Sequence, residues 1–345
     1  MSDRTFAEDL EAIMTHAERD LLALRGADIL ITGGTGFVGT WLVSALCHAD
    51  QRLHLGIRTT ILTRDPIGFA DRSPQLAAWA TLLRGEVTTV PPLPAYNLAV
   101  HAATPASAAL NDDNPDLMRG TIVDGMRSLL EALEPSGSIP LLFTSSGAVY
   151  GPQPVEMEHT PEEFEPVPDA IEARNAYALG KRDAEAIALA ASHAGGPSLR
   201  LARLFAFVGP HLPLNAHFAI GNFVRDAIAG GPIRVAGDGS AVRSYLYAGD
   251  MIEQLLAILV RGLPNRAYNI GSEEAITIRE LAALVGRELA PKARVEIAGL
   301  AQGALPTGAG SRYVPATTRI ADELGCRARV DLPEAIRRTA ASHSV

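Results

Sequence analysis

The chain has 345 residues, 47% of them hydrophobic and 20% charged, which is typical of a soluble globular protein with one large α/β unit and a smaller lobe. A formal net charge of −9 argues against a nucleic-acid partner, because phosphate backbones attract basic surfaces. Two isolated cysteines argue against a disulfide framework, and no apolar run reaches the length of about 18 residues that a membrane span needs, so a cytoplasmic protein without membrane contact is expected.

The first segment, residues 6–21, carries apolar side chains at steps of three and four. This spacing predicts one face of an amphipathic helix. Because the segment carries no chemical constellation, we expect an added arm that packs on the body of the protein or on a second subunit. Its apolar positions are Phe6, Leu10, Ile13, Ala17 and Leu21.

From Ala27 onwards, short apolar runs alternate with helical patterns, which predicts an α/β fold with a Rossmann-type doubly wound parallel sheet. Strands are expected at 28–32, 59–63, 97–101, 140–144, 198–205, 233–239 and 267–271, and helices at 36–48, 115–133, 175–192, 218–229, 251–260 and 278–289. A Pro/Gly-rich linker covers 299–310. The predicted domains are a helical arm (1–26), a dinucleotide-binding domain (27–206, with 241–272 returning to it), and a smaller C-terminal α/β substrate lobe (207–240 and 273–345).

The first strand runs into a glycine-rich turn, Ile-Leu-Ile-Thr-Gly-Gly-Thr-Gly-Phe-Val-Gly, over residues 29–39. Gly33 permits a tight turn, Gly36 lets the backbone approach a pyrophosphate, and Gly39 allows close packing of helix on strand. The free N–H groups at the start of the helix favour an anion. The turn therefore predicts a dinucleotide site, which also includes Thr32, Thr35, Phe37 and Val38.

The end of the second strand bears on which dinucleotide binds. An acidic residue there would hold the adenosine ribose hydroxyls, whereas an arginine accommodates a 2′-phosphate. Arg64 fits the second case, but Asp65 stands beside it, and Arg64 could equally be a solvated turn residue. The cofactor is therefore NAD or NADP, with NADP slightly favoured.

Tyr177 and Lys181 are four residues apart on a predicted helix and so lie on one face. Such a lysine can hold a nicotinamide ribose and stabilise the phenolate, which at pH 7 requires roughly 4 kcal/mol. This spacing is common by chance. A second motif supports a catalytic role for Tyr177 and Lys181, because the strand at 140–144 ends in a hydroxyl-rich turn that contains Ser145 and Ser146.

These motifs together resemble the extended short-chain dehydrogenases/reductases. The resemblance covers nearly everything after Ala27, including the glycine turn, the segment Val-His-Ala-Ala at 100–103 and the segment ending in Val-Tyr-Gly at 149–151. It implies a catalytic role for Ser146, Tyr177 and Lys181, in which the serine hydroxyl bridges the substrate oxygen and the phenol. It also implies further cofactor contacts at Glu86, Val87, His101, Ala102 and Ala103, and a structural role for Ser145.

The two residues after Ser146 narrow the reaction. Family members that dehydrate the sugar of a nucleoside diphosphate sugar have a segment like Thr-Asp-Glu-Val-Tyr-Gly here. Those that decarboxylate the sugar carry a Glu before Val-Tyr. This chain has Gly147 and Ala148, which cannot move a proton. The leading hypothesis is thus an epimerase that transiently oxidises C4 of a nucleoside diphosphate sugar, and the alternative is an NADPH-dependent keto-sugar reductase. A sugar dehydratase and a non-enzymatic dinucleotide sensor fit the residues less well.

The C-terminal half contains a segment that resembles the family's Arg-x-x-x-Tyr-x-x-Asp motif, and the resemblance implies that its Arg243 clamps the substrate diphosphate. Arg312 is either a second clamp or part of a surface ion pair. Asn215 and His217, between the lobes, are expected substrate contacts, and no metal site is expected because neither a carboxylate nor a third histidine accompanies His211 and His217.

Two departures leave the identity of the sugar open. Ala206 and Thr121 stand where many relatives place asparagine. The resemblance also implies a homodimer that forms through the helices at 115–133 and 175–192.

Overall fold

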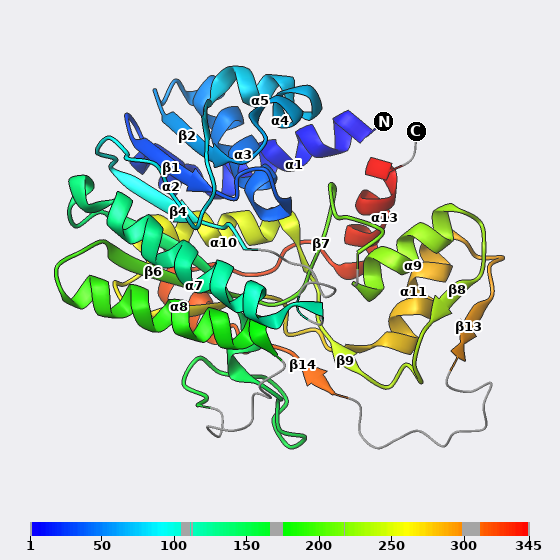
Figure 1. Ribbon diagram of the computed structural model, residues 1–345. Helices are drawn as coiled ribbons and strands as arrows, with labels where there is room; N and C mark the ends of the chain where they lie inside the picture. Colours follow the sequence, from blue (N-terminus) through cyan, green and yellow to red (C-terminus); the bar gives the residue numbers. More distant parts are fainter. Residues whose placement is uncertain are drawn as a thin grey trace.

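The computed structural model describes residues 2–104, 111, 113–165, 175–216, 218–298 and 311–343. At its centre lies a sheet of seven strands in the order β11-β6-β5-β4-β1-β2-β3, whose neighbours all pair in parallel (Figure 1). The sheet confirms the predicted Rossmann-type fold, including the return of the strand near residue 267 to the sheet edge. The strands are β1 (Asp28–Thr32), β2 (Arg58–Thr63), β3 (Thr81–Arg84), β4 (Leu98–His101), β5 (Pro140–Ser146), β6 (Ser198–Leu204) and β11 (Ala267–Ile270).

Helices cover both faces of this sheet, as the nearly continuous apolar strands require. Ile29 and Ile31 of β1 point into one core with α3 (Phe37–Leu53) and α10 (Ala248–Arg261). Leu30 points the opposite way, into a core with α7 (Pro115–Ala132). The helix α8 (Ala176–His193) lies beside α7 on that face (Figure 1).

The N-terminal arm packs on the body of the protein, as one of the two expected alternatives. It consists of α1 (Ser2–His16) and α2 (Glu18–Ala23), and Ile13 and Leu21 are fully buried. Helix α1 contacts α3, α10 and the last helix, α13 (Leu332–His343), so that both ends of the chain meet (Figure 1).

The smaller lobe lies beyond the carboxyl ends of the strands (Figure 1). Helices α9 (Ala219–Ile228) and α11 (Ile278–Leu289) pack together, and a capping box of Thr277 and Glu280 begins α11. Short strand pairs complete the lobe and join it to the sheet domain. They are β8 (Ile233–Val235) with β13 (Val295–Ile297), β7 (Phe207–Val208) with β10 (Leu246–Tyr247), and β9 (Val242–Arg243) between β12 (Ile276–Thr277) and β14 (Arg312–Tyr313).

Several elements differ from the prediction. The helices α4 (Pro66–Arg72) and α5 (Pro74–Trp79), strand β3 and the later helix α12 (Thr318–Leu324) were not expected, because pieces this short show no clear period. The 12-residue helix α13 was not expected either. The strand expected at 233–239 already ends at Val235. The linker at 299–310 lies outside the described residues, and the division into arm, domain and lobe stays a prediction. No helix within the described ranges is long and apolar enough to cross a membrane.

Candidate functional site

The glycine turn connects β1 to α3 and shows why each glycine is there. Gly33 has φ +74°, and a Cβ there would come within 2.4 Å of the Ala102 carbonyl carbon; a Cβ at Gly39 would come within 2.1 Å of the Gly33 oxygen. A Cβ at Gly36 would meet only the Gly33 oxygen, at 3.5 Å. Protein packing therefore requires the first and third glycines, while the middle one leaves open space beside the uncapped start of α3. A pyrophosphate fits this arrangement of free N–H groups and open backbone.

The neighbouring strand end supports the same turn. Oγ1 of Thr32 lies 2.7 Å from Nδ1 of the buried His101, whose ring stacks on Phe143 at 5.4 Å. Burial, assisted by repulsion from Lys181, lowers the pKa of His101 to about 3. The imidazole is therefore neutral and ties the ends of β1 and β4 together, which places the backbone of Ala102 and Ala103 against the glycine turn.

The residues expected near the adenosine lie at the ends of β2 and β3. Asp65 caps α4, since its Oδ1 accepts the Gly68 N–H at 2.9 Å, whereas Arg64 is exposed and has no ion pair recorded among the described residues. Glu86 is exposed as well, and Val87 packs against Gly125. Cofactor contacts at these positions stay a prediction.

Ser146, Tyr177 and Lys181 come together at the carboxyl end of β5, next but one to the strand that leads into this turn. Ser146 ends β5, where its Oγ accepts the Ala148 N–H at 3.1 Å, and it lies near enough to Tyr177 to act on the pKa of that phenol. Lys181 is 1% exposed, and its Nζ donates to Oγ1 of Thr104 and to the Thr144 carbonyl oxygen, each at 2.7 Å. Lys181 Nζ also lies 6.0 Å from the centroid of the Tyr177 ring.

Burial dominates the electrostatics of this cluster. Burial lowers the pKa of Lys181 to about 7, against a smaller opposing effect of Glu185. Burial raises the pKa of Tyr177, and the hydrogen bond of Ser146 opposes that rise. Lys181 Nζ faces the Tyr177 ring, and its role in stabilising the phenolate stays a prediction.

The carboxylate nearest to the cluster is engaged elsewhere. Glu185 accepts a hydrogen bond from Ser145 at 2.5 Å and pairs with Arg203 at 2.7 Å, both side chains being largely buried. Arg203 also donates to the phenol of Tyr150 at 2.9 Å. Ser145 thus has a structural partner, in line with the role expected for it.

The lobe contributes two arginines without carboxylate partners among the described residues. Arg243 Nη1 donates to the carbonyl oxygens of Ser311 and Val242 at 2.7 and 2.8 Å, and burial lowers the pKa of its guanidinium. Arg312 Nε donates to the Glu158 carbonyl oxygen at 2.8 Å. Asn215 is exposed in the loop before α9, and His217 lies outside the described residues.

One site residue was missed. Tyr313 follows Arg312 on β14 and packs its ring on Phe205, with the centroids 4.5 Å apart, beside the turn that follows Ser146. Its Oη lies 2.7 Å from the position that a Cβ of residue 147 would occupy. The glycine beside Ser146 was the available signal, since a missing side chain there leaves room for another group.

Comparisons with known proteins agree with this geometry. The family model described as "NAD dependent epimerase/dehydratase family" matches residues 29–271. Among similar proteins, UDP-glucuronic acid decarboxylase 1 of Arabidopsis thaliana is 30% identical over 78% of this chain and 60% of its own length. UDP-glucuronic acid decarboxylase 5 of the same plant is 29% identical over 78% and 76%, respectively.

Similar solved structures include UDP-glucose 4-epimerase of Thermotoga maritima with UDP-glucose, at a TM-score of 0.75 and 22% identity over 92% of this chain and 98% of that one. A UDP-N-acetylglucosamine 4-epimerase from Methanobrevibacter ruminantium, in complex with UDP-N-acetylmuramic acid, reaches 0.78 at 20% identity over the same shares. At these identities, the likeness establishes a common fold.

Proposed function

Because the chain belongs to the NAD-dependent epimerase/dehydratase family, we propose that it is a nucleotide-sugar epimerase that transiently oxidises C4 of the sugar. One observation carries the proposal. Ser146, Tyr177 and Lys181 meet at the carboxyl end of β5, while the next two positions, Gly147 and Ala148, hold no group that can move a proton. Such a centre suits reversible oxidation and lacks the acid and base for elimination.

In the proposed complex the glycine turn and the start of α3 hold the pyrophosphate, with Thr32, Thr35, Phe37 and Val38 around it. Lys181 uses two of its three N–H donors on Thr104 and Thr144, which leaves one for the hydroxyls of the nicotinamide ribose. A nicotinamide held there would supply reversible hydride transfer at C4 of the sugar.

The proton is moved by the chain's own side chains. The Tyr177 phenolate takes the proton of the C4 hydroxyl at its Oη and gives it back to the same oxygen when the keto sugar is reduced. Ser146 donates a hydrogen bond to the oxygen on which charge develops. Because burial raises the pKa of Tyr177, ionisation of the phenol needs the positive charge of the oxidised cofactor as well as Ser146.

The substrate is proposed to be a nucleoside diphosphate sugar. Arg243 is a partly buried guanidinium without a carboxylate among the described residues, which favours an incoming diphosphate. Arg312, Asn215 and His217 are proposed as further substrate contacts.

A keto-sugar reductase that consumes NADPH is the second candidate. The observation that favours it is Arg64, which has no ion pair among the described residues, beside an Asp65 whose carboxylate is engaged in capping α4. An arginine in this position suits the 2′-phosphate of NADP. The same observation slightly favours NADP over NAD for the epimerase.

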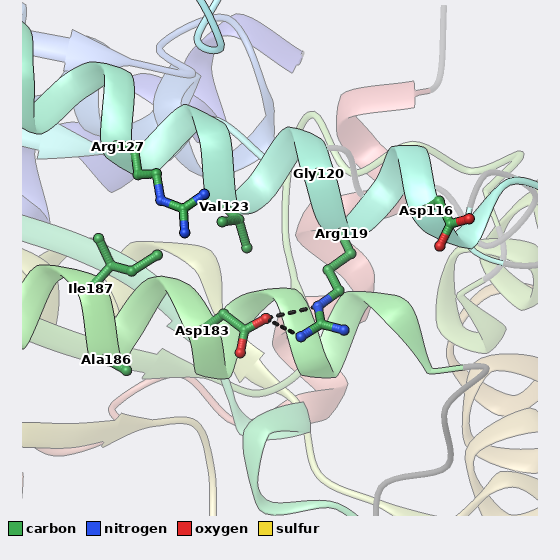
Figure 2. A pocket seen from close by; sticks show the side chains of 8 residues that line it. All are labelled: Asp116, Arg119, Gly120, Val123, Arg127, Asp183, Ala186 and Ile187. Carbon is green, nitrogen blue, oxygen red and sulfur yellow. Dashed lines mark hydrogen bonds and ion pairs between the residues drawn. The ribbon is translucent and has the colours of Figure 1, made fainter.

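We also propose that the protein forms a homodimer through α7 and α8. A surface groove of about 530 Å³ follows these two helices, and the pair Arg119–Asp183 bridges it at 2.7 Å (Figure 2). Leu117 on α7 and Leu189 on α8 are 53% and 36% exposed. Apolar side chains exposed on both helices, around a bridged groove, are what a second copy would cover.

The test combines cofactor, substrate and product. Untreated protein is analysed by native mass spectrometry for bound dinucleotide and mass of the assembly, and then incubated with UDP-, dTDP-, GDP- and CDP-sugars, including UDP-glucuronic acid. The proposal expects C4 epimers by NMR without net consumption of dinucleotide, and their absence with Tyr177→Phe. Steady oxidation of NADPH would instead support the reductase, and release of carbon dioxide from UDP-glucuronic acid would overturn both.

A further inference from the structure

The N-terminal arm lies outside the site described so far. The match to the family model begins at residue 29, after α1 and α2 have ended. Helix α1 nevertheless contacts α3 and α10 of the sheet domain, and it contacts α13, which packs on α9 and α11 of the lobe (Figure 1). The arm therefore touches both parts of the molecule between which a substrate would lie.

The segment that the arm reaches is the loop at 209–216, which follows β7 and leads into α9. Strand β6, just before β7, pairs in parallel with β5, and Ser146 ends β5. The loop thus leaves the sheet at its carboxyl edge, where parallel sheets bind their ligands. Asn215, a proposed substrate contact, belongs to this loop.

Three side chains connect the arm, α3 and the loop. The buried indole of Trp41 on α3 donates its Nε1–H to the Pro210 carbonyl oxygen at 2.8 Å. The ring of Phe6 on α1 contacts both Trp41 and His211, with centroids 4.8 and 4.7 Å apart and ring planes close to perpendicular. Edge-to-face packing of this kind is a favourable geometry for aromatic rings.

The loop turns sharply at the residue that Phe6 contacts. His211 has φ +67°, a backbone region that residues with a Cβ rarely adopt. Such a conformation persists only where the surroundings hold it. On the far side of the turn, Leu212 is buried, and its N–H donates to the Gly209 carbonyl oxygen at 3.2 Å. The turn is thus held by Leu212 from within the core and by Phe6 from the arm.

We propose that Phe6 is a positioning residue, whose ring holds the turn at His211 and thereby keeps the loop that carries Asn215 in place for the substrate. This inference rests on the proposed function, which assigns Asn215 to the substrate. A loop that is ordered before binding loses less conformational entropy when the substrate arrives. The arm therefore contributes to substrate affinity without touching the substrate.

The first test needs no substrate. Hydrogen exchange of the backbone amides is followed by mass spectrometry in wild type and in Phe6→Ala, for peptides that cover 208–216 and β1. We expect exchange in the loop to become about threefold faster or more in Phe6→Ala, while exchange in β1 stays the same. Unchanged exchange in the loop would overturn the inference.

Leu21→Ala is the matched control, because it also removes an apolar side chain of the arm. Leu21 is fully buried and lies on α2, away from the loop in sequence and in contacts. The variant is expected to lower the thermal stability and to leave loop exchange, relative to β1, as in the wild type. An equal increase in both variants would show that any loss of packing in the arm loosens the loop, which would overturn the assignment to Phe6.

Kinetics separate positioning from chemistry. With the sugar nucleotide that the wild type converts, Phe6→Ala should raise KM about three- to tenfold and leave kcat within about twofold, because the loop must then be ordered on binding. The affinity for the dinucleotide, measured by calorimetry, should not change. An unchanged KM would overturn the inference and leave the proposed function intact.

A double-mutant cycle tests the route through His211. His211→Asn removes the ring and keeps a residue that accepts the left-handed backbone. Since both changes break the same contact, the double variant Phe6→Ala/His211→Asn should raise KM no more than the more severe single variant. Independent, multiplying effects would show that Phe6 does not act through His211, and the inference would fail.

The proposed function can fail separately. If no sugar nucleotide is epimerised by the wild type, the same variants are compared by calorimetry for binding of UDP-, dTDP-, GDP- and CDP-sugars. Affinity that is about three- to tenfold weaker in Phe6→Ala, and unchanged in Leu21→Ala, would support the role of Phe6 in a protein with another activity. Equal affinities in wild type and Phe6→Ala would overturn it.

Discussion

Two regions of the molecule contain buried charged side chains, which are paired in one region and lack a carboxylate partner among the described residues in the other. In the seam where the N-terminal arm meets α10 and α13, carboxylates and arginines are paired, as in Asp20 with Arg261 at 2.6 Å and Asp9 with Arg338 at 2.5 Å. In the candidate site, Lys181 donates only to neutral oxygens within the described part of the chain, and Arg243 there donates to a serine hydroxyl and to backbone carbonyls.

The difference distinguishes buried charges that stabilise the fold as ion pairs from buried cations that are left for a ligand. A buried ion pair neutralises itself, so removing one partner leaves the other unpaired. A buried cation without a carboxylate costs stability in the free protein, and a bound anion or ribose recovers that cost. The predictions below exploit this contrast, beginning with the largest effect.

Tyr177→Phe should lower epimerisation by about 10²- to 10⁴-fold, because it removes the proposed acid and base of the centre. Binding of the dinucleotide, measured by calorimetry, and the free energy of unfolding should hardly change. Activity that stays within tenfold of wild type would contradict the assigned role.

Asp9→Ala should destabilise the protein by roughly 3 to 5 kcal/mol, measured by denaturant unfolding, because Arg338 and the Tyr247 hydroxyl both lose their buried partner. The activity of the folded fraction should be unaffected. The double variant Asp9→Ala/Arg338→Met should recover part of the loss. A loss below about 1 kcal/mol would show that this pair is not structural in the sense argued.

Arg243→Met should weaken substrate binding without lowering stability, which is the opposite of what Asp9→Ala should do. KM for the sugar nucleotide is expected to rise about 10- to 100-fold, because charge-assisted hydrogen bonds to the diphosphate are lost. The free energy of unfolding should stay the same or rise, since no carboxylate among the described residues is left unpaired. Arg338→Met is the matched control and should lower stability while leaving KM unchanged.

The smallest expected effect is on the pH dependence of the free energy of unfolding. His101 has a folded-state pKa of about 3, below the ordinary value of 6.5, so between these values the unfolded chain binds more protons. Stability should therefore fall as the pH decreases below 6.5, with a contribution of about 1.4 kcal/mol at pH 5.5. In His101→Gln this contribution should be absent, which unfolding curves at pH 7.5 and 5.5 can measure. Equal pH dependence in both proteins would contradict a buried neutral imidazole.

Much of the fold could be predicted because its long elements have strong periods. The strand at 28–32 and the helix at 278–289 have the predicted bounds, since a turn or cap residue marks their ends. By contrast, α4 and α5 begin with Pro66 and Pro74 but span only seven and six residues, too few for a pattern to stand out.

The candidate site also contains residues that the sequence predicts and residues that it does not. Ser146, Tyr177 and Lys181 could be predicted because each belongs to a local motif, and the structure brings these three side chains together. Tyr313 could not be predicted, because its position depends on a pairing between β14 and β9, some 70 residues apart in sequence. The partners of Arg243 and Arg312 likewise depend on contacts between distant segments.

The contact between α1 and α13 also has a consequence for folding during synthesis. During synthesis, α1 leaves the ribosome long before α13, with which it packs. Until α13 follows, the apolar side of α1 around Ile13 has only part of its binding surface, and Asp9 lacks Arg338. A nascent chain stalled before Leu332 should therefore expose this helix to chaperones.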